Sequence, residues 1–332
     1  MIIARAHLSV GGDILITLSP LLLKHRMDAG ICDTNPRTPE EAAQIVGLFL
    51  RSRGLYTYSA GSNYKRNFNR GLFYWILARH RLPSMWRYFS ACIKAGHNLE
   101  SNLEGLGQSI LIRAVRALEA RDVIGTQFYV PQSNDTRDQI MYHFDYLTLV
   151  LAGAIDAQAR IAHRAYKIAG NERYASFRDK KFRKALEKNG AQELVQIVDD
   201  MHFDNFSTLL YEPRNTIHGA AMQTIASVQD SEPESSFVMI PDPVAQKLLA
   251  SAEQLGGAGA WGLAPGPPLG ILLEPYTYSV ALVREGLATI DKIASATDVN
   301  RLFPAGQQIP SLMDTEPHDE IFRWAKRVSL LG

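Results

Sequence analysis

The sequence predicts a mainly α-helical protein, with a C-terminal helical bundle preceded by a mostly helical N-terminal domain. Apolar residues recur every three to four positions over long segments, as on helices that bury one face. Residues that start and end helices flank several of these segments. Hydrophobic residues make up 46% and charged residues 21% of the 332 residues, which is enough apolar material for a sizeable core.

The first twenty residues depart from the helical pattern. Apolar residues alternate with other residues over 2–10 and again over 14–18, and Gly11-Gly12-Asp13 lies between the two runs. This pattern predicts a short β-hairpin. A buried helix over residues 14–24 is the alternative, because a short apolar run does not decide between the two.

The first helix is predicted from Pro39 to about Arg53. Thr38 suits the N-cap, and Glu40 and Glu41 suit the positive end of the helix dipole. Beyond this helix, composition predicts a loop over residues 55–70. The spacing of apolar residues then predicts three helices, over residues 72–80, 86–95 and 99–120.

A domain boundary is predicted at Val130–Asp135, where loop-forming residues cluster. It separates a basic N-terminal domain, residues 1–130, from a bundle over residues 138–295, with a tail over 296–332. Helices are predicted over 138–169, 182–188, 191–201, 213–228, 243–255 and 274–294, with a polar loop over 230–243, an irregular Gly/Pro-rich stretch over 256–270 and a short amphipathic segment over 321–331.

Charge is distributed unevenly along the chain. Residues 1–190 hold 27 Lys/Arg and 16 Asp/Glu, whereas residues 191–332 hold 8 and 18. Aromatic residues interleave with cations over residues 51–95, as on surfaces that stack bases and neutralise phosphates. The alternative is a helical core with a solvated cationic face. The residues predicted to bind RNA are Arg51, Arg53, Lys65, Arg66 and Arg70.

The cysteine content and the apolar runs bear on the compartment. Cys32 and Cys92 are the only cysteines, which predicts a cytoplasmic protein without a disulfide framework. The N-terminus lacks the pattern of a signal peptide. The apolar run over residues 14–23 contains Pro20 and is shorter than the roughly 20 residues that span a bilayer, so no membrane segment is predicted.

The sharpest chemical pattern is Arg214-Asn215-Thr216-Ile217-His218. If Pro213 opens a helix, positions 214 and 218 lie on one helix face. Histidine transfers protons near neutral pH, and arginine holds a phosphate and stabilises its developing charge. The set therefore suits cleavage of RNA through its own 2′-hydroxyl, without a metal.

These residues resemble the RNase motif of the HEPN superfamily, in which Arg is often followed by a polar residue and then closely by His. The resemblance covers residues 138–295 and implies RNA cleavage or RNA binding by a homodimer, as in toxin or antiphage effectors. It assigns Arg214 and His218 as the catalytic pair and Asn215 as their polar companion. Only three residues separate Arg214 from His218, one fewer than the usual minimum of the family.

Two other classes of function remain open. The chain could be a non-catalytic helical protein-interaction module, in which Arg214 pairs with an acid such as Glu212 or Asp204 and His218 is structural. It could also be an enzyme for a small substrate, with residues 256–270 as a lid.

No cofactor or metal is predicted. The acidic run at residues 199–204 contains side chains that can bind a divalent ion, but such runs are usually solvated helix ends. The Gly-x-Gly-x-x-Gly pattern at residues 257–262 is followed by prolines that forbid the helix of a dinucleotide site.

Overall fold

The computed structural model folds mainly into α-helices, as the sequence predicts. The chain divides into two units, a smaller one of residues 1–70 with 317–332 and a larger one of residues 71–316. The structure describes residues 14–24, 36–60, 64–99, 102–130, 132–216, 223–227, 235–266, 270–303, 323–325 and 327–329.

The smaller unit contains the helix α3, Pro39–Ser52, which begins where the sequence predicts. The Thr38 hydroxyl accepts from the Glu41 N–H at 3.1 Å, and the Glu41 carboxylate accepts from the Thr38 N–H at 2.9 Å. This reciprocal capping box satisfies two donors at the helix start. The other elements of the unit are β1 (Leu15–Ile16), α2 (Pro20–Lys24), β2 (Pro36–Arg37), β3 (Thr57–Ala60) and β4 (Tyr64–Asn67).

Of two predictions for the smaller unit, one is wrong and the other stays a prediction. The described strand β1 pairs in parallel with β2, but residues 2–10, the first arm of the predicted hairpin, lie outside the described residues. The predicted loop at residues 55–70 contains the antiparallel pair of β3 and β4. Extended backbone is favoured by Thr57, Tyr58 and Tyr64. The antiparallel pairing joins the backbone hydrogen-bonding groups of the two segments.

The C-terminal segment belongs to the smaller unit. The ring of Trp324 stacks on that of Phe68 with centroids 5.8 Å apart, and Ala325 is buried. Residues 299–302 instead form a 3-10 turn, η4, in the larger unit. The predicted tail over residues 296–332 is therefore divided between two units. Val299 and Leu302 are buried in the larger unit, and Ala325 is buried in the smaller one.

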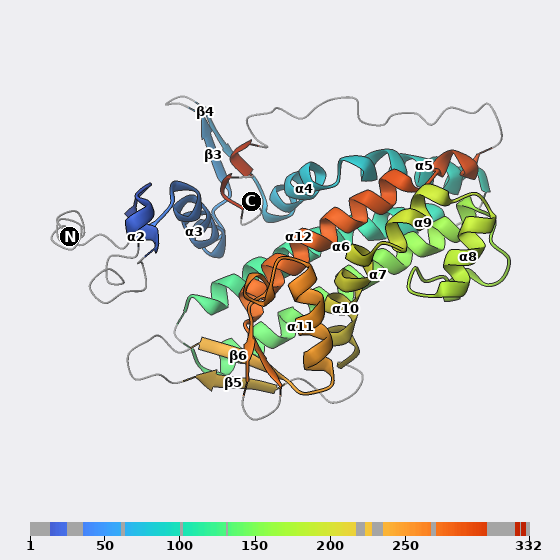
Figure 1. Ribbon diagram of the computed structural model, residues 1–332. Helices are drawn as coiled ribbons and strands as arrows, with labels where there is room; N and C mark the ends of the chain where they lie inside the picture. The colour runs from blue at the N-terminus through green and yellow to red at the C-terminus, as the bar shows by residue number, and fades with distance from the viewer. Residues whose placement is uncertain are drawn as a thin grey trace. The chain divides into compact units, whose positions relative to one another are not determined.

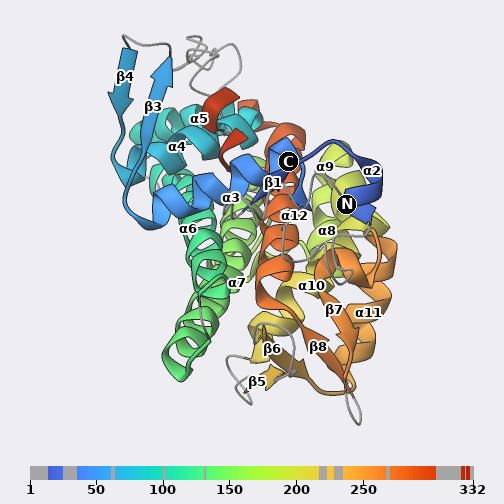
Figure 2. The ribbon, with the colours of Figure 1, turned by 90° about the vertical axis from the view of Figure 1, so that its left-hand side faces the viewer.

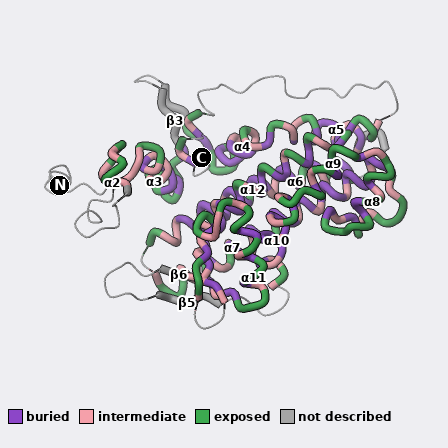
Figure 3. The backbone as a smooth tube through the Cα atoms, viewed as in Figure 1, coloured by how far each residue is buried: buried purple, intermediate pink, exposed green. Residues whose placement is uncertain are grey.

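The helix α12, Pro275–Ala296, is the centre of the larger unit and packs against α5, α6, α7, α9 and α10 (Figures 1 and 2). Buried residues concentrate along α6, α7 and α12 (Figure 3). No helix in the described part of the chain is both long and apolar enough to cross a bilayer. The other helices of the larger unit are α4 (Arg70–Arg81), α5 (Pro83–Leu99), α6 (Leu103–Phe128), α7 (Asn134–Ala165), α8 (Lys180–Lys188), α9 (Gln192–Val198), α10 (Met201–Thr216) and α11 (Val244–Gln254).

The predicted domain boundary at Val130–Asp135 is the connection between α6 and α7, inside the larger unit. These two helices pack along each other. The Ser133 hydroxyl caps α7 by accepting from the Thr136 N–H at 3.2 Å. The apolar faces of α6 and α7 cover one another, so the units divide after residue 70 and not at residue 130.

A four-stranded antiparallel sheet, in the order β5-β6-β8-β7, completes the larger unit. Its strands differ from the prediction in three places. β5 lies in the helix predicted over residues 213–228, β6 in the polar loop predicted over 230–243, and β7 in the irregular stretch predicted over 256–270. Alternate residues of β6 and β8 are buried, which local composition did not reveal. The strands are β5 (Gln223–Ser227), β6 (Ser235–Ile240), β7 (Leu263–Pro265) and β8 (Ile271–Leu273).

Candidate functional site

The helix α10 carries Arg214 and Asn215 in its last turn, not in its first. The prediction that Pro213 opens a helix is wrong, because Pro213 lies inside α10. A proline there leaves the carbonyl of Leu209 without its helical donor. The hydroxyl of Tyr278 donates to that carbonyl at 2.6 Å and takes the place of the missing N–H.

The two candidate site residues that the structure describes lie near the surface at the end of α10. Asn215 is exposed and Arg214 is half-buried. One Nη atom of Arg214 donates to the Asn215 side-chain oxygen at 3.4 Å. The third candidate, His218, lies outside the described residues, so its position relative to Arg214 stays a prediction.

The helix α7 runs beside α10 and brings Asp156 to the motif. The hydroxyl of Tyr211 donates to an Asp156 carboxylate oxygen at 3.1 Å. Burial raises the pKa of Asp156, while the bond from Tyr211 and the charge of Arg214 oppose that rise. Burial and the neighbouring carboxylate raise the pKa of Tyr211 above its ordinary value, so its hydroxyl stays protonated.

Four arginines from separate elements surround Asp156 and Tyr211, and we call them the arginine cluster. Three of them interact electrostatically with the Asp156 carboxylate. The fourth places its Cζ atom 4.4 Å from the centroid of the Tyr211 ring. The members of the cluster are Arg113 on α6, Arg160 on α7, Arg178 in the loop before α8 and Arg214 on α10.

The arginine cluster has more positive charge than its neighbours neutralise. Asp156 is the carboxylate that Arg113, Arg160 and Arg214 share. Arg178 is exposed, and the Nε–H of Arg214 is enclosed without an acceptor among the described residues. Guanidinium N–H groups that lack a carboxylate partner suit the oxygens of a phosphate.

The residues predicted to bind RNA in the smaller unit do not form one exposed set. Arg51 is only 6% exposed, and its guanidinium donates to the Val328 carbonyl, so it is a structural residue. Arg53 is exposed, with its guanidinium over the Phe49 ring at 5.4 Å. Arg70 is exposed at the start of α4, whereas the side chains of Lys65 and Arg66 lie outside the described part.

The aromatic residues of the stretch 51–95 are mostly core residues where the structure describes them. Phe73, Tyr74 and Tyr88 are at most 3% exposed, and Tyr56 and Phe68 are also buried. Phe73, Tyr74 and Tyr88 lie on α4 and α5 and fit the helical-core alternative, whereas Tyr56 and Phe68 are buried outside helices. A ring enclosed in this way has no free face on which a base could stack.

The acidic run at residues 199–204 is held by an arginine. Arg183 donates to a carboxylate oxygen of Asp199 at 2.7 Å and of Asp204 at 3.4 Å. His202 lies 3.4 Å from a carboxylate oxygen of Glu285 on α12. These contacts link α8, α9, α10 and α12, so the run has a structural role.

Sequence reasoning missed most of the arginine cluster. Arg160 lies four residues after Asp156, a helical spacing that was visible in the sequence. Arg113 and Arg178 come from other elements, and no local signal connects them to Arg214. Comparisons with protein-family models, with curated proteins and with solved structures found no match for this chain.

Proposed function

We propose that the chain binds RNA at the arginine cluster and cleaves it there without a metal. The observation that carries the proposal is the convergence of three guanidinium groups on the Asp156 carboxylate, with a fourth over the neighbouring Tyr211 ring, next to the motif that begins at Arg214. Phosphate binding is the function that such a surplus of positive charge supports best.

The motif residues have separate roles in this proposal. Arg214 binds the phosphate that is attacked, Asn215 orients the substrate, and His218 transfers the proton. The 2′-hydroxyl of RNA loses its proton and attacks the adjacent phosphorus, and the 5′-oxygen leaves and takes up a proton, so that a 2′,3′-cyclic phosphate and a 5′-hydroxyl remain. Stabilisation of the negative charge that develops on the phosphate is the task of the guanidinium groups.

The resemblance to the HEPN superfamily extends the proposal to the whole protein. It adds a helical bundle with an RNase motif, assembly as a homodimer, and a role as a cytoplasmic toxin or antiphage effector. Asp156 and Arg214 support it because they come from two long helices that pack together, α7 and α10.

The proposal is tested with the full chain and end-labelled single-stranded RNA or tRNA in EDTA. We expect the wild type to leave 2′,3′-cyclic phosphate ends, and His218→Ala and Arg214→Gln to abolish cleavage. The matched control is His202→Ala, which removes a histidine that lies against Glu285. This control should cleave like the wild type.

The melting temperatures decide between loss of catalysis and loss of fold. Unchanged melting temperatures with lost cleavage would assign the motif residues to the reaction. Cleavage by His218→Ala at the wild-type rate would refute the assignment.

A non-catalytic protein-interaction module is the second candidate. The half-buried position of Arg214 and the enclosure of its Nε atom favour it, because such an arginine also fits a structural role. It predicts that Arg214→Gln lowers the melting temperature and that the wild type cleaves no RNA.

A further inference from the structure

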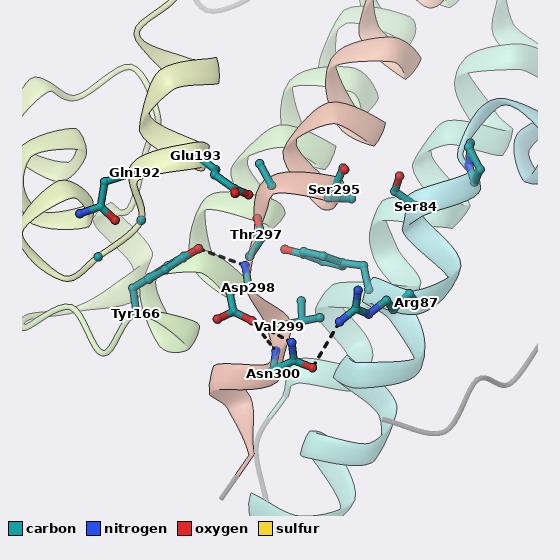
Figure 4. A pocket seen from close by; sticks show the side chains of 16 residues that line it. Ser84, Arg87, Tyr166, Gln192, Glu193, Ser295, Thr297, Asp298, Val299 and Asn300 are labelled. Atoms are coloured by element: carbon teal, nitrogen blue, oxygen red, sulfur yellow. Dashed lines mark hydrogen bonds between the residues drawn. The ribbon is translucent and has the colours of Figure 1, made fainter. Parts of the chain in front are cut away.

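A cavity of about 790 Å³ lies in the larger unit, away from the arginine cluster (Figure 4). It is lined by the start of α5, the turn before α9, and the end of α12 with η4. Tyr166, the C-cap residue of α7, also lines it. The volume lies within the range of roughly 300–1,000 Å³ that is usual for small-molecule sites. No residue of the arginine cluster lines it.

Tyr88 and Tyr166 line this cavity, and no described group accepts the proton of either hydroxyl. Tyr88 is 1% exposed, and its hydroxyl makes no hydrogen bond with the described residues. Tyr166 is 3% exposed, and its hydroxyl accepts from the Asp298 N–H at 3.0 Å (Figure 4). A buried polar group without a partner is costly, so an unused donor in a cavity indicates a ligand that accepts from it.

Two unpaired charges of opposite sign line the cavity from different elements. Arg87 on α5 donates to the Asn300 side-chain oxygen at 3.3 Å, but no carboxylate in the described ranges pairs with it. Glu193 on α9 lies across the cavity from Arg87 in Figure 4, and no described group pairs with its carboxylate. Asp298 does not add an unpaired charge, because it binds Asn300 and Arg301.

We infer that this cavity binds a small zwitterion, with the ligand carboxylate at Arg87 and Tyr88 and the ligand amine at Glu193. A guanidinium and a phenol hydroxyl donate together to a carboxylate, and a carboxylate accepts from an ammonium group. The cavity is larger than a single amino acid requires. A short peptide with free termini therefore matches both its size and its separated charges.

The probes are triglycine, N-acetyl-triglycine and triglycine amide, titrated into the full chain by calorimetry. We expect triglycine to bind, and each blocked peptide to bind about tenfold more weakly, since each lacks one charge-assisted contact. Glu193→Gln should remove the difference between triglycine and its acetylated form. Arg87→Gln should remove the difference between triglycine and its amide.

Tyr88→Phe keeps the proposal testable without disturbing the fold. This variant removes a buried hydroxyl that has no partner, so the unliganded protein should melt at the same or a higher temperature. Its affinity for triglycine should fall about tenfold. The matched control is Glu187→Gln on the exposed face of α8, which should bind all three peptides like the wild type.

The results separate this proposal from the RNA proposal. Equal affinity for the three peptides, or no binding of triglycine at millimolar concentration, would overturn the zwitterion site. So would wild-type affinity in both Tyr88→Phe and Glu193→Gln. RNA cleavage would be unaffected by any of these outcomes, because the cavity shares no residue with the arginine cluster.

Discussion

Tyr278 of α12 supplies the hydrogen bond that Pro213 removes from α10. Its hydroxyl is fully buried and donates at 2.6 Å to the carbonyl of Leu209, four residues before the proline. The helix therefore continues through Pro213 to Thr216 and carries Arg214 in its last turn. This one contact joins the candidate site to the central helix of the larger unit.

Tyr278→Phe should lower the free energy of unfolding by about 1–3 kcal/mol, because it leaves a buried carbonyl without a donor. Urea denaturation measures the change. The loss should be smaller in a chain that also carries Pro213→Ala, since the new N–H of residue 213 can bond to the Leu209 carbonyl. Equal losses in both backgrounds would show that the hydroxyl does not replace the helical N–H.

Asp122 of α6 compensates a fully buried arginine. Its carboxylate accepts from the Nε of Arg121 at 3.0 Å and from the Tyr74 hydroxyl at 2.9 Å. Asp122→Asn should lower the free energy of unfolding by about 3–5 kcal/mol, because the Arg121 charge remains buried and unpaired. Tyr74→Phe removes the hydrogen bond to Asp122 and leaves the carboxylate in place, so it should lower the free energy of unfolding by about 1 kcal/mol. A smaller effect of Asp122→Asn than of Tyr74→Phe would contradict this account.

Glu172 and Arg164 give the stability a dependence on acid pH. The hydrogen bond from Arg164 holds the pKa of Glu172 below its ordinary value of about 4.5. Stability from this pair is therefore present above pH 4.5 and is lost as the pH falls through the lowered pKa. Glu172→Gln should reduce the free energy of unfolding at pH 7 by about 1 kcal/mol, with a difference that vanishes in acid. A difference that grows in acid would exclude the pair as its cause.

Arg178 is the exposed member of the arginine cluster, so it tests RNA binding apart from catalysis. Arg178→Gln should weaken binding of single-stranded RNA at every sequence. It should also lower the slope of log K against log salt by about 0.7, the loss of one phosphate contact. Arg284→Gln is the control, because Arg284 already pairs with Glu285 at 3.1 Å. Equal slopes for the two variants would remove Arg178 from the RNA site.

Local signals in the sequence predicted most of the helices. Thr38 and Pro39 start α3 because side-chain capping and the fixed proline backbone act within one turn. The long apolar pattern over residues 138–169 also predicted α7, apart from the positions of its ends, because helical spacing is a local signal too. Pro213 misled the prediction because a local rule places proline in the first turn, whereas a contact from Tyr278 permits it inside α10.

The sequence by itself determined the mainly helical class, the helix starts that capping residues mark, and the motif at Arg214, since each depends on residues within a few turns. The tertiary structure decided the four-stranded sheet, the division after residue 70 and the arginine cluster. Strand pairing and charge convergence join residues that lie far apart in the chain. Strand pairing and charge convergence are stabilised by contacts that form only when the chain packs. No local pattern in the sequence therefore predicts them.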